Sequence, residues 1–527
     1  MSVASGSASE TSSGGGRVDD QAKRHELVIV ANRLPVQCVD GEWRTSPGGL
    51  VRAMLGVARG RRGAWVGWPG DTAAQTPEAT AAGADEAIPH LPHDAGCADL
   101  STQGVHPVED VVLVPVTLSA DEFHHYYERI SNGALWPLYH DAIRPSVFDA
   151  ASWSVYRDVN RRFAESVADT VAEGGTVWVH DYHLHLVPEM VRELRPDVKI
   201  GFFLHIPFPP QELFMRLPWR EEIIRGLLGA DVVGFQRRVA AENFVALAHR
   251  LVGSGIVESD HSTVGVQTED GRLVHVGAFP ISIDVDEIEE IVHRPASIDR
   301  VRQIREQLGD PEAILLGVDR LDYTKGIDVR LAGFASLLES RRASAEASTG
   351  RDCKPPIVLV QIAVPGREGL DDYVEERRKI EQLVGAVNGD HAALGCPAVH
   401  YLRTSLSLED LVPLYMAADV MLVTPLRDGM NLVAKEFVAA RADKSGVLVL
   451  SEFAGASDEL TDAILVNPHD PDAVVDAMRC ALELSAEERR ERMTLLRKAV
   501  AGSDVHDWAE AFLRSLAGEP VQGSLGE

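Results

Sequence analysis

The strongest constraint on the fold is an alternation of short apolar runs with longer amphipathic segments, which begins at Leu27 and continues along almost the whole chain. Short β-branched or apolar runs predict buried strands, and longer segments with helical periodicity predict helices. Their alternation predicts parallel strands joined by helical crossovers. The predicted strands are 27–31, 64–68, 111–116, 176–179, 199–204 and 232–235 in the first half, and 313–318, 357–362, 399–402, 420–424, 447–450 and 463–466 in the second.

Two such sets of strands exceed what one twisted open sheet usually holds, so the sequence predicts an α/β protein with two doubly wound parallel sheets. The break is expected near 282–295, where a further predicted strand, 274–279, is followed by a helical segment. Sheets that face each other place the carboxyl ends of their strands around one cleft. The expected division is a disordered tail over 1–24, an N-terminal Rossmann-like domain over 25–284, a C-terminal Rossmann-like domain over 285–503, a terminal helix over 504–518 that packs back on the N-terminal domain, and a disordered tail over 519–527.

The charge and composition of the chain argue against several classes of protein, including nucleic-acid-binding and membrane-spanning proteins. The 527 residues carry 51 basic and 80 acidic side chains, a formal charge of −29, which argues against broad attraction to nucleic acid or to an anionic membrane surface. An anionic substrate must therefore be held by a local basic pocket. No run reaches the ~18 to 20 apolar residues of a membrane span, and the N-terminus lacks a signal-peptide pattern. The five cysteines form no CxxC pair, which predicts neither a disulfide framework nor a zinc knuckle, and we expect a cytoplasmic protein.

A basic pair follows the first predicted strand of the second half. Arg320 and Lys325 lie in the segment 317–326, which reads GVDRLDYTKG. Two cations at the carboxyl end of a strand can neutralise a diphosphate. Arginine and lysine beside acidic residues are also common surface ion pairs, so this alternative stays open at this point.

A glycine-bearing turn follows the predicted strand 420–424 and opens a helical segment with the sequence PLRDGMNLVAKE. The free amides of 429–432 would point into the cleft, where the helix dipole, worth about half a positive charge, favours a phosphate oxygen. Glu436, one helical turn later, would face the same opening and accept hydrogen bonds from a ribose diol. The alternative is that Asp428 caps the helix and that Glu436 lies on a solvated helix face.

Polar and aromatic residues also follow the strands of the first half. Asn32 and Arg33 come directly after the first strand, and paired glycines at 48 and 49 would let the backbone approach a phosphate closely. Aromatic rings further along either stack on sugar faces or belong to the core. The aromatic candidates are Trp65, Trp68, Tyr126, Tyr127 and Trp136.

Two further strand ends carry histidine and aspartate. One is followed by HDYH at 180–183, and the next by HIPFP at 205–209. Histidine and carboxylate side chains suit a metal ion such as zinc or iron, but neighbours in sequence such as His180 and Asp181 need not converge on one point. The more economical interpretation is that Asp181 accepts, and His205 donates, a hydrogen bond to sugar hydroxyls.

Taken together, these motifs resemble those of the trehalose-6-phosphate synthases, a family of retaining glycosyltransferases with the GT-B architecture. The resemblance rests on the order and number of the motifs, and it spans nearly the whole chain apart from the two tails. The ordered motifs are Asn32-Arg33, Gly48-Gly49-Leu50, Gly67-Trp68, Tyr126-Tyr127, Leu135-Trp136-Pro137, His180-Asp181-Tyr182-His183, His205-Ile206-Pro207-Phe208-Pro209, the segment from Arg320 to Gly326 and the segment from Asp428 to Glu436.

The resemblance implies both the fold and the reaction. Two Rossmann-like domains would face each other across a cleft, and glucose would pass from UDP-, ADP- or GDP-glucose to glucose 6-phosphate, giving α,α-trehalose 6-phosphate and the nucleoside diphosphate. It implies no cofactor and no metal, and the family often forms homo-oligomers, dimers or tetramers. Longer members append a phosphatase domain, so a chain of this length is expected to stop at the phosphorylated product. Two alternatives remain: a different phosphorylated acceptor such as glycerol 3-phosphate, or a non-catalytic subunit that binds sugar phosphates.

The resemblance also implies roles for single residues. The acceptor would be held by Arg33, Trp68, Tyr127, Trp136 and Arg367, with the two arginines on its 6-phosphate. The donor diphosphate and ribose would be held by Gly49, Arg320, Lys325, Gly429, Met430, Asn431, Leu432 and Glu436. The transferring glucose would be contacted by Asp181, His205 and Asp428. These last three residues would form the catalytic set together with Arg320 and Lys325.

The resemblance further implies how the configuration of the sugar is retained. Retaining glycosidases use a carboxylate nucleophile paired with a carboxylic acid, and no such pair is identifiable in this sequence. The implied alternative is a front-face route, in which the leaving phosphate helps to deprotonate the incoming hydroxyl. Asp181 is the carboxylate to suspect if the intermediate is instead covalent.

Overall fold

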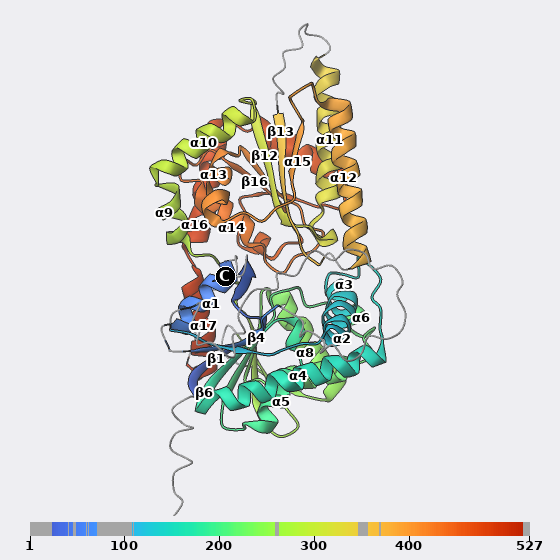
Figure 1. Ribbon diagram of the computed structural model, residues 1–527, viewed down its shortest axis with the longest axis vertical. Helices are drawn as coiled ribbons and strands as arrows, with labels where there is room; N and C mark the ends of the chain where they lie inside the picture. The colour runs from blue at the N-terminus through green and yellow to red at the C-terminus, as the bar shows by residue number, and fades with distance from the viewer. Residues whose placement is uncertain are drawn as a thin grey trace, which may run out of the picture.

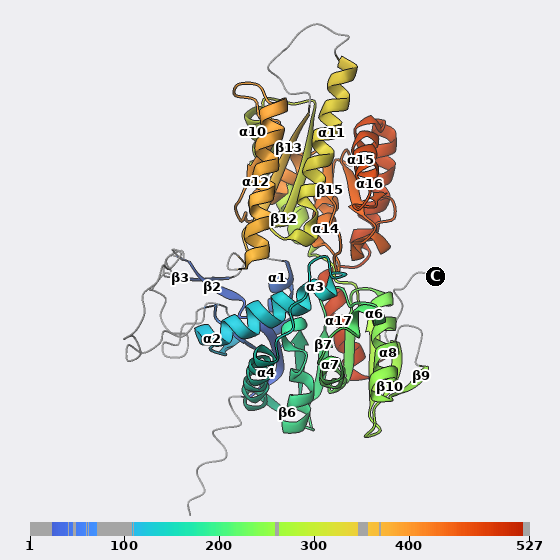
Figure 2. The same cartoon turned by 90° about the vertical axis from the view of Figure 1, so that its right-hand side faces the viewer.

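The computed structural model describes residues 24–39, 42–45, 49–59, 61, 63–70, 108, 110–258, 263–345, 357–367 and 370–519. The predicted tails therefore lie almost wholly outside the described residues. The described residues form two lobes stacked along the long axis of the molecule, each built on one sheet with helices packed around it (Figure 1, Figure 2).

The first lobe contains a nine-stranded sheet in the order β5-β4-β1-β6-β7-β8-β11-β10-β9. Its strands are β1 His25–Arg33, β4 Ala64–Trp68, β5 Val112–Pro115, β6 Val171–His180, β7 Lys199–Phe203, β8 Val232–Phe235, β9 Gly255–Glu258, β10 Thr263–Gln267 and β11 Leu273–Ala278, and a separate hairpin pairs β2 Val36–Val39 with β3 Glu42–Thr45. Its helices are α1 Gly49–Arg59, α2 Ala120–Glu122, the π-helix η2 Phe123–Leu135, α3 Trp136–Tyr139, α4 Ala150–Thr170, the 3₁₀-helix η3 Tyr182–Leu184, α5 Val187–Leu194, α6 Gln211–Phe214, α7 Arg220–Leu228 and α8 Arg238–Val252.

The second lobe contains a six-stranded parallel sheet in the order β14-β13-β12-β15-β16-β17. Its strands are β12 Ala313–Arg320, β13 Ile357–Val364, β14 Val399–Leu402, β15 Val420–Val423, β16 Val447–Ser451 and β17 Ile464–Val466. Its helices are α9 Val285–Val292, α10 Pro295–Gln307, η4 Tyr323–Lys325, α11 Ile327–Ala345, α12 Asp371–His391, α13 Leu408–Ala417, α14 Leu432–Ala440, η5 Gly455–Asp458, α15 Pro471–Glu483 and α16 Ala486–Ala501. The central strands are buried almost throughout, because helices cover both faces of a parallel sheet.

Every predicted strand is present, and the predicted fold class of two doubly wound α/β sheets is confirmed. One correction applies to the first sheet, which is not wholly parallel. Strand β10 pairs antiparallel with both β11 and β9 at one edge. Strands β9 and β10 and the β2–β3 hairpin were not predicted, because short strands that follow one another without a helix lack the amphipathic crossover that reveals parallel strands.

The last helix of the chain, α17 Val505–Ala517, returns to the first lobe and packs on β7 and β8. The Trp508 indole donates a hydrogen bond to the Phe279 carbonyl over 3.1 Å, and the Phe512 ring stacks on Trp178 with 4.6 Å between centroids. A Cβ atom at Gly201 in β7 would lie 2.6 Å from the Phe512 ring, so glycine is required for this approach. Helices α9 and α10 pack in the second lobe, and a division of the chain at 284/285 remains our proposal.

Candidate functional site

The carboxyl ends of the central strands of both sheets meet where the two lobes touch. Asp181 follows β6 and His205 follows β7 in the first lobe, whereas Arg320 ends β12 and Asp428 follows β15 in the second. The two backbones are in direct contact here, since a Cβ atom at Gly429 would lie 2.2 Å from the carbonyl oxygen of His205. The topology therefore brings together residues that are far apart in the sequence.

Lys325 and Asp428 form a buried ion pair at this point. The ammonium group donates to Oδ2 of Asp428 over 2.6 Å, and the two side chains are only 9% and 15% exposed. Burial by itself would raise the pKa of Asp428, but Lys325 and the Asn431 amide keep it below its usual value. The surface ion pair weighed as an alternative for Lys325 is therefore wrong. Arg320, in contrast, is exposed and makes no ion pair with the described residues.

The turn before α14 ends on Asn431, a residue with positive φ, and leads directly into the N-terminus of the helix. Asn431 has φ +92° and caps the helix, its side chain accepting from the Ala434 N–H over 3.1 Å. The helix cap is thus Asn431 and not Asp428, which corrects one alternative. Met430 is buried, and Leu432 begins the helix, whose first-turn N–H groups lack intrahelical acceptors. Gly49 occupies the corresponding first position of α1, while Gly48 lies outside the described residues.

Replacing Gly429 with alanine is expected to lower turnover by at least about tenfold and to destabilise the fold by about 1 to 3 kcal/mol, because backbone must move to relieve the contact with His205. The control is Gly389→Ala, since a Cβ atom at Gly389 in α12 meets nothing within 4 Å and alanine favours a helix. Melting temperature and steady-state rate measure both effects. Equal behaviour of the two variants would show that the two backbones do not make this contact.

Arg367 lies in a buried aromatic and polar box between the lobes. Its guanidinium carbon sits 3.8 Å from the centroid of Trp136, and Nη2 donates to the Tyr182 hydroxyl over 3.1 Å. Nη1 donates to Oδ2 of Asp322 over 3.3 Å and also to the Tyr373 hydroxyl. The Arg320 guanidinium lies over the same Trp136 ring, 5.2 Å from its centroid. Two arginines from the second lobe thus converge on one indole of the first.

Asp322 balances this positive cluster. The carboxylate is 2% exposed, and burial alone would raise its pKa, but Arg367, Arg320 and Lys325 lower the pKa to about 2. Asp322 is therefore charged at neutral pH. Arg367, Arg320 and Lys325 therefore all lie near this carboxylate, at the carboxyl end of β12.

Arg33 is the last residue of β1, in the first lobe. Its guanidinium carbon lies 4.8 Å from the centroid of Trp68. A Cβ atom at Gly70 would lie 2.3 Å from that guanidinium, so the glycine makes room for it. The structure therefore brings Arg33 and Trp68 together, as the sequence predicted.

A chain of rings links the two arginines. Trp68 lies 6.2 Å from Tyr127, the Tyr127 ring stacks on His183 at 5.8 Å, and His183 lies 3.9 Å from Tyr182. Tyr182 in turn lies 5.7 Å from Trp136, the ring beneath Arg367. Three of the aromatic candidates, Trp68, Tyr127 and Trp136, are therefore linked through His183 and Tyr182 into one wall that runs from Arg33 to Arg367. Trp136 and Trp68 are 2% and 3% exposed, so both also belong to the core.

The π-helix η2 positions Tyr127 in this wall. The Asn132 amide donates to the Tyr127 carbonyl over 2.8 Å, and the Ser131 hydroxyl donates to the Tyr126 carbonyl over 2.8 Å. The backbone itself shows the π-helical spacing at the end of η2, where the Trp136 N–H donates to the carbonyl of Ser131, five residues earlier. The Tyr126 hydroxyl donates to the Asn32 side chain over 2.9 Å, tying the helix to the end of β1.

Asp181 has a strained backbone, with φ +73° and ψ 168°. A residue other than glycine rarely adopts this conformation, and such strain persists chiefly at functional sites. Oδ1 accepts a hydrogen bond from the His205 backbone N–H over 3.3 Å. Burial raises the pKa of Asp181 to about 6, although the Tyr182 and His205 amides, Arg320 and Arg367 act in the opposite direction.

This raised pKa predicts an acid limb in the pH profile. The carboxyl group is protonated below about pH 6, and the protonated form is a poorer acceptor for a sugar hydroxyl. We expect kcat/KM for the donor to fall as the pH drops below about 6. In Asp181→Asn, which cannot ionise, the overall rate should be low and this limb absent. Persistence of the limb in the variant would assign it to another group.

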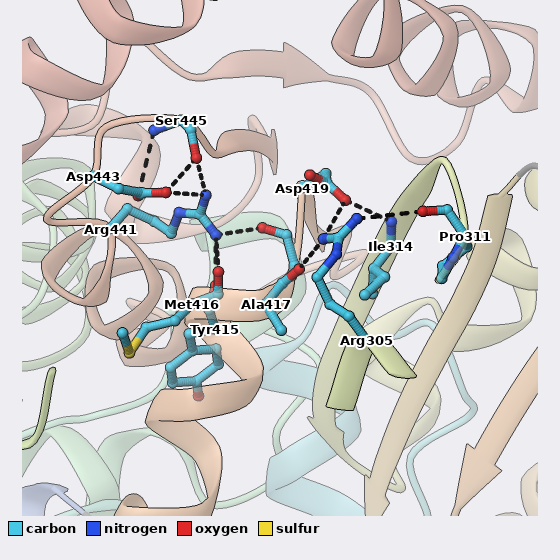
Figure 3. Close-up of polar contacts among 11 residues, drawn as sticks. Arg305, Pro311, Ile314, Tyr415, Met416, Ala417, Asp419, Arg441, Asp443 and Ser445 are labelled. Carbon is cyan, nitrogen blue, oxygen red and sulfur yellow. Dashed lines mark hydrogen bonds and ion pairs between the residues drawn. The ribbon is translucent and has the colours of Figure 1, made fainter. Parts of the chain in front are cut away.

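Glu436 lies on α14 and accepts a hydrogen bond from the Tyr415 hydroxyl over 2.9 Å, so it is not on a freely solvated helix face. Figure 3 shows how Tyr415 is held in place. The Arg441 guanidinium donates to the carbonyls of Tyr415 and Met416 at the end of α13, over 3.1 and 2.5 Å, and also pairs with Asp443. Glu436 also lines a cavity between the lobes together with Thr45, Leu55, Arg59, Ile283, Asp284, Glu287, Ile288, Leu408 and His506.

Several residues of this site were not singled out from the sequence. Asp322 and Tyr182 lie inside the motifs named above, but roles were predicted only for neighbouring residues such as Lys325 and Asp181. Tyr373 lies in α12 and carries no motif at all. In the part of the chain that the structure describes, no three histidine, cysteine, aspartate or glutamate side chains are grouped to hold a metal ion. The same part contains no helix long and apolar enough to span a bilayer.

Comparison with known proteins gives one consistent result. Residues 25–518 match glycosyltransferase family 20. The trehalose-6-phosphate synthase of Mycolicibacterium gilvum is 50% identical over 98% of this chain and 97% of its own length, and that of Mycobacterium avium is 49% identical over 96% and 98%.

Solved structures agree with these relatives. A UDP-forming α,α-trehalose-phosphate synthase from Burkholderia xenovorans, solved with glucose 6-phosphate, superposes with a TM-score of 0.78 at 30% identity, covering 94% of this chain and 100% of that one. An E. coli protein bound to UDP-2-fluoro glucose superposes with a TM-score of 0.78 at 30% identity, covering 93% and 98%.

Proposed function

This chain belongs to glycosyltransferase family 20, among the trehalose-6-phosphate synthases, and we propose on that premise how its site works. The enzyme transfers glucose from a nucleoside-diphosphate glucose to glucose 6-phosphate, giving α,α-trehalose 6-phosphate and the nucleoside diphosphate. The observation that carries the residue assignment is the gathering of cations at the carboxyl ends of the two sheets, in a chain with a formal charge of −29. Two phosphorylated ligands explain why these charges are held there.

The donor lies against the second lobe in this proposal. Arg320, Lys325 and the amides at 429–432 hold the diphosphate, and Gly49 approaches it from the first lobe. Glu436 accepts hydrogen bonds from the ribose, with the Tyr415 hydroxyl fixing its orientation. Asp181, His205 and Asp428 contact the transferring glucose. The support is that all three stand where the two lobes meet.

The acceptor lies along the aromatic wall. Arg33 and Arg367 bind the 6-phosphate from the two ends of that wall, and Trp68, Tyr127 and Trp136 line the space between them. Asp322 accepts a hydrogen bond from Nη1 of Arg367 over 3.3 Å and holds the guanidinium in position. Such preorganised charge costs no reorganisation when the ligand binds.

The chemical step breaks the bond between the anomeric carbon and the diphosphate oxygen, and forms a bond from that carbon to the acceptor hydroxyl oxygen. Negative charge grows on the departing diphosphate, where Arg320, Lys325 and the helix amides stabilise it. The hydroxyl proton passes to a leaving phosphate oxygen on the same face, so the configuration is retained. Asp181 stabilises positive charge on the ring in this route and would be the nucleophile in a covalent one.

Product analysis tests the function directly. The purified chain, given glucose 6-phosphate and UDP-, ADP- or GDP-glucose in turn, should release the nucleoside diphosphate and an α,α-1,1-linked disaccharide phosphate, identified by proton and phosphorus NMR. Glycerol 3-phosphate in competition tests the alternative acceptor. Transfer to glycerol 3-phosphate alone, or binding without turnover, would replace this function by one of the two alternatives.

Turnover is expected to be unaffected by excess EDTA. Arginine, lysine and backbone amides neutralise the diphosphate in the proposed mechanism, so no divalent ion is required for that task. Initial rates with and without the chelator measure this. If EDTA stops the reaction and a divalent ion restores it, the charge neutralisation assigned to Arg320 and Lys325 is incomplete.

Two further parts of the proposal concern the protein in the cell. We infer that the enzyme is cytoplasmic, because nucleotide sugars and sugar phosphates are made in the cytoplasm. We also infer that it forms a homo-oligomer, either a dimer or a tetramer, because members of the family often do. Fractionation and light scattering coupled to size exclusion test these two statements. A monomeric mass would remove the second.

A further inference from the structure

A second histidine lies directly behind His205. His180 is the last residue of β6 and is 3% exposed, and His205 follows the neighbouring strand β7. Nδ1 of His180 and Nε2 of His205 are 3.0 Å apart, and the rings stack with 5.3 Å between centroids. Neither ring makes another hydrogen bond to the residues that the structure describes. The two imidazoles therefore determine each other's proton positions.

Both rings are neutral at physiological pH. Burial lowers the pKa of His205 to about 3 and also holds the pKa of His180 far below its ordinary value. A neutral imidazole carries one proton, so one of its nitrogens donates and the other accepts. The bond between the two rings consequently needs one ring to donate and the other to accept.

The surroundings of His180 decide which ring donates. Its Nε2 is buried and has no hydrogen-bond partner among the described residues. A proton on Nε2 would be a buried N–H without an acceptor, which is rarer in proteins than an unpaired lone pair. A proton on Nδ1 is instead used in the bond to His205. His180 therefore donates, Nε2 of His205 accepts, and the proton of His205 resides on its Nδ1.

We propose that His180 is a positioning residue that holds His205 in the tautomer protonated on Nδ1, and so makes His205 a hydrogen-bond donor to a hydroxyl of the transferring glucose. This inference rests on the proposed function. Nδ1 of His205 makes no hydrogen bond to a described residue, so it is the nitrogen left for a ligand. Asp181, which follows His180 in the sequence, accepts a hydrogen bond from the His205 backbone N–H over 3.3 Å. This bond ties the acceptor, the Asp181 carboxylate, to the residue that carries the donor, His205.

Two isosteric substitutions separate this role from simple packing. The side-chain amide nitrogen of asparagine can replace Nδ1 of a histidine, whereas that of glutamine reaches the position of Nε2. His180→Asn keeps the donor and should retain kcat/KM for the donor sugar within about threefold of wild type. His180→Gln removes it and should lower this value by about tenfold or more, with KM for glucose 6-phosphate unchanged. Melting temperatures of the two variants control for folding.

A double-mutant cycle identifies His205 as the route of the effect. In a His205→Ala background, His180→Gln should cause no further loss, because there is no ring left to orient. Equal losses for His180→Asn and His180→Gln, or a full additional loss in the His205→Ala background, would overturn the inference.

A spectroscopic measurement needs no turnover and separates this inference from the function. In protein labelled with ¹⁵N-histidine, with His205→Ala used for assignment, the nitrogen shifts should report a protonated Nδ1 and a bare Nε2 for His205. If the wild type makes no disaccharide phosphate but shows this pattern, the function falls and the tautomer stands. A protonated Nε2 on His205 would refute the tautomer even in an active enzyme.

Discussion

Replacing Lys325 with alanine is expected to lower kcat by about 100- to 1000-fold while the chain keeps its fold. The ammonium group is the most deeply buried of the cations assigned to the diphosphate, and it is held 2.6 Å from Asp428. Removing it takes away stabilisation of charge that develops only as the bond breaks, so kcat should fall more than KM for the donor changes. Steady-state kinetics with each substrate varied measure the split.

The loss of Lys325 also leaves Asp428 without its ion pair, so folding must be checked. The Asn431 amide still donates to Oδ2 of Asp428 over 3.1 Å, which limits the cost. Lys498→Ala, on the exposed face of α16, is the matched control and should behave as wild type. Unchanged turnover in Lys325→Ala would remove this lysine from the site.

Replacing Arg33 with alanine is expected to raise KM for glucose 6-phosphate by roughly 10- to 100-fold, with kcat at saturation much less affected. A charge-assisted hydrogen bond to phosphate contributes about 1.5 to 3 kcal/mol, and about 1.4 kcal/mol corresponds to a factor of ten. Arg33 is exposed at the end of β1 and lies over Trp68, so its side chain is not part of the buried core.

Unphosphorylated glucose as the acceptor makes this experiment specific. Wild type and Arg33→Ala should use glucose equally poorly, because the contact that the variant lacks is to the phosphate. Arg238→Ala, an 81% exposed arginine paired with Glu242, controls for the loss of a surface charge. If Arg33→Ala lowers transfer to glucose and to glucose 6-phosphate to the same degree, Arg33 has a structural role and does not bind the phosphate.

The sequence predicted the parts of this site that follow directly from strands. Asp181, His205, Arg320 and Asp428 each come at or just after a parallel strand, and the carboxyl ends of such strands converge by topology. The strands themselves were predictable because β12 and β13 are almost wholly apolar and buried. The family resemblance supplied the roles, which apolar periodicity alone cannot assign.

The contacts between distant segments could not be predicted in this way. Arg367 reaches Asp322 in its own lobe and Tyr182 in the other, which depends on how the lobes dock. The same holds for Gly429, whose need for glycine comes from the carbonyl of His205. Tyr127 was predicted as a candidate, but its place on a π-helix has no signature in a hydrophobic pattern read at 3.6 residues per turn.

Asp428 and Glu436 show why local signals were ambiguous. When only neighbours in sequence are considered, Asp428 also fits a helix cap and Glu436 a solvated helix face. In the structure, Glu436 accepts a hydrogen bond from Tyr415, 21 residues away in the sequence, and Asp428 pairs with Lys325, 103 residues away. Side-chain pairing over such distances is set by tertiary packing, which a single sequence does not display.

A crystal structure of the chain with a nucleoside diphosphate and glucose 6-phosphate bound tests the central claim most directly. We expect the diphosphate within hydrogen-bond distance of Arg320, Lys325 and the amides at 429–432, and the 6-phosphate bridged by Arg33 and Arg367. A diphosphate seated away from Arg320 and Lys325, or a 6-phosphate that touches neither Arg33 nor Arg367, would contradict the account.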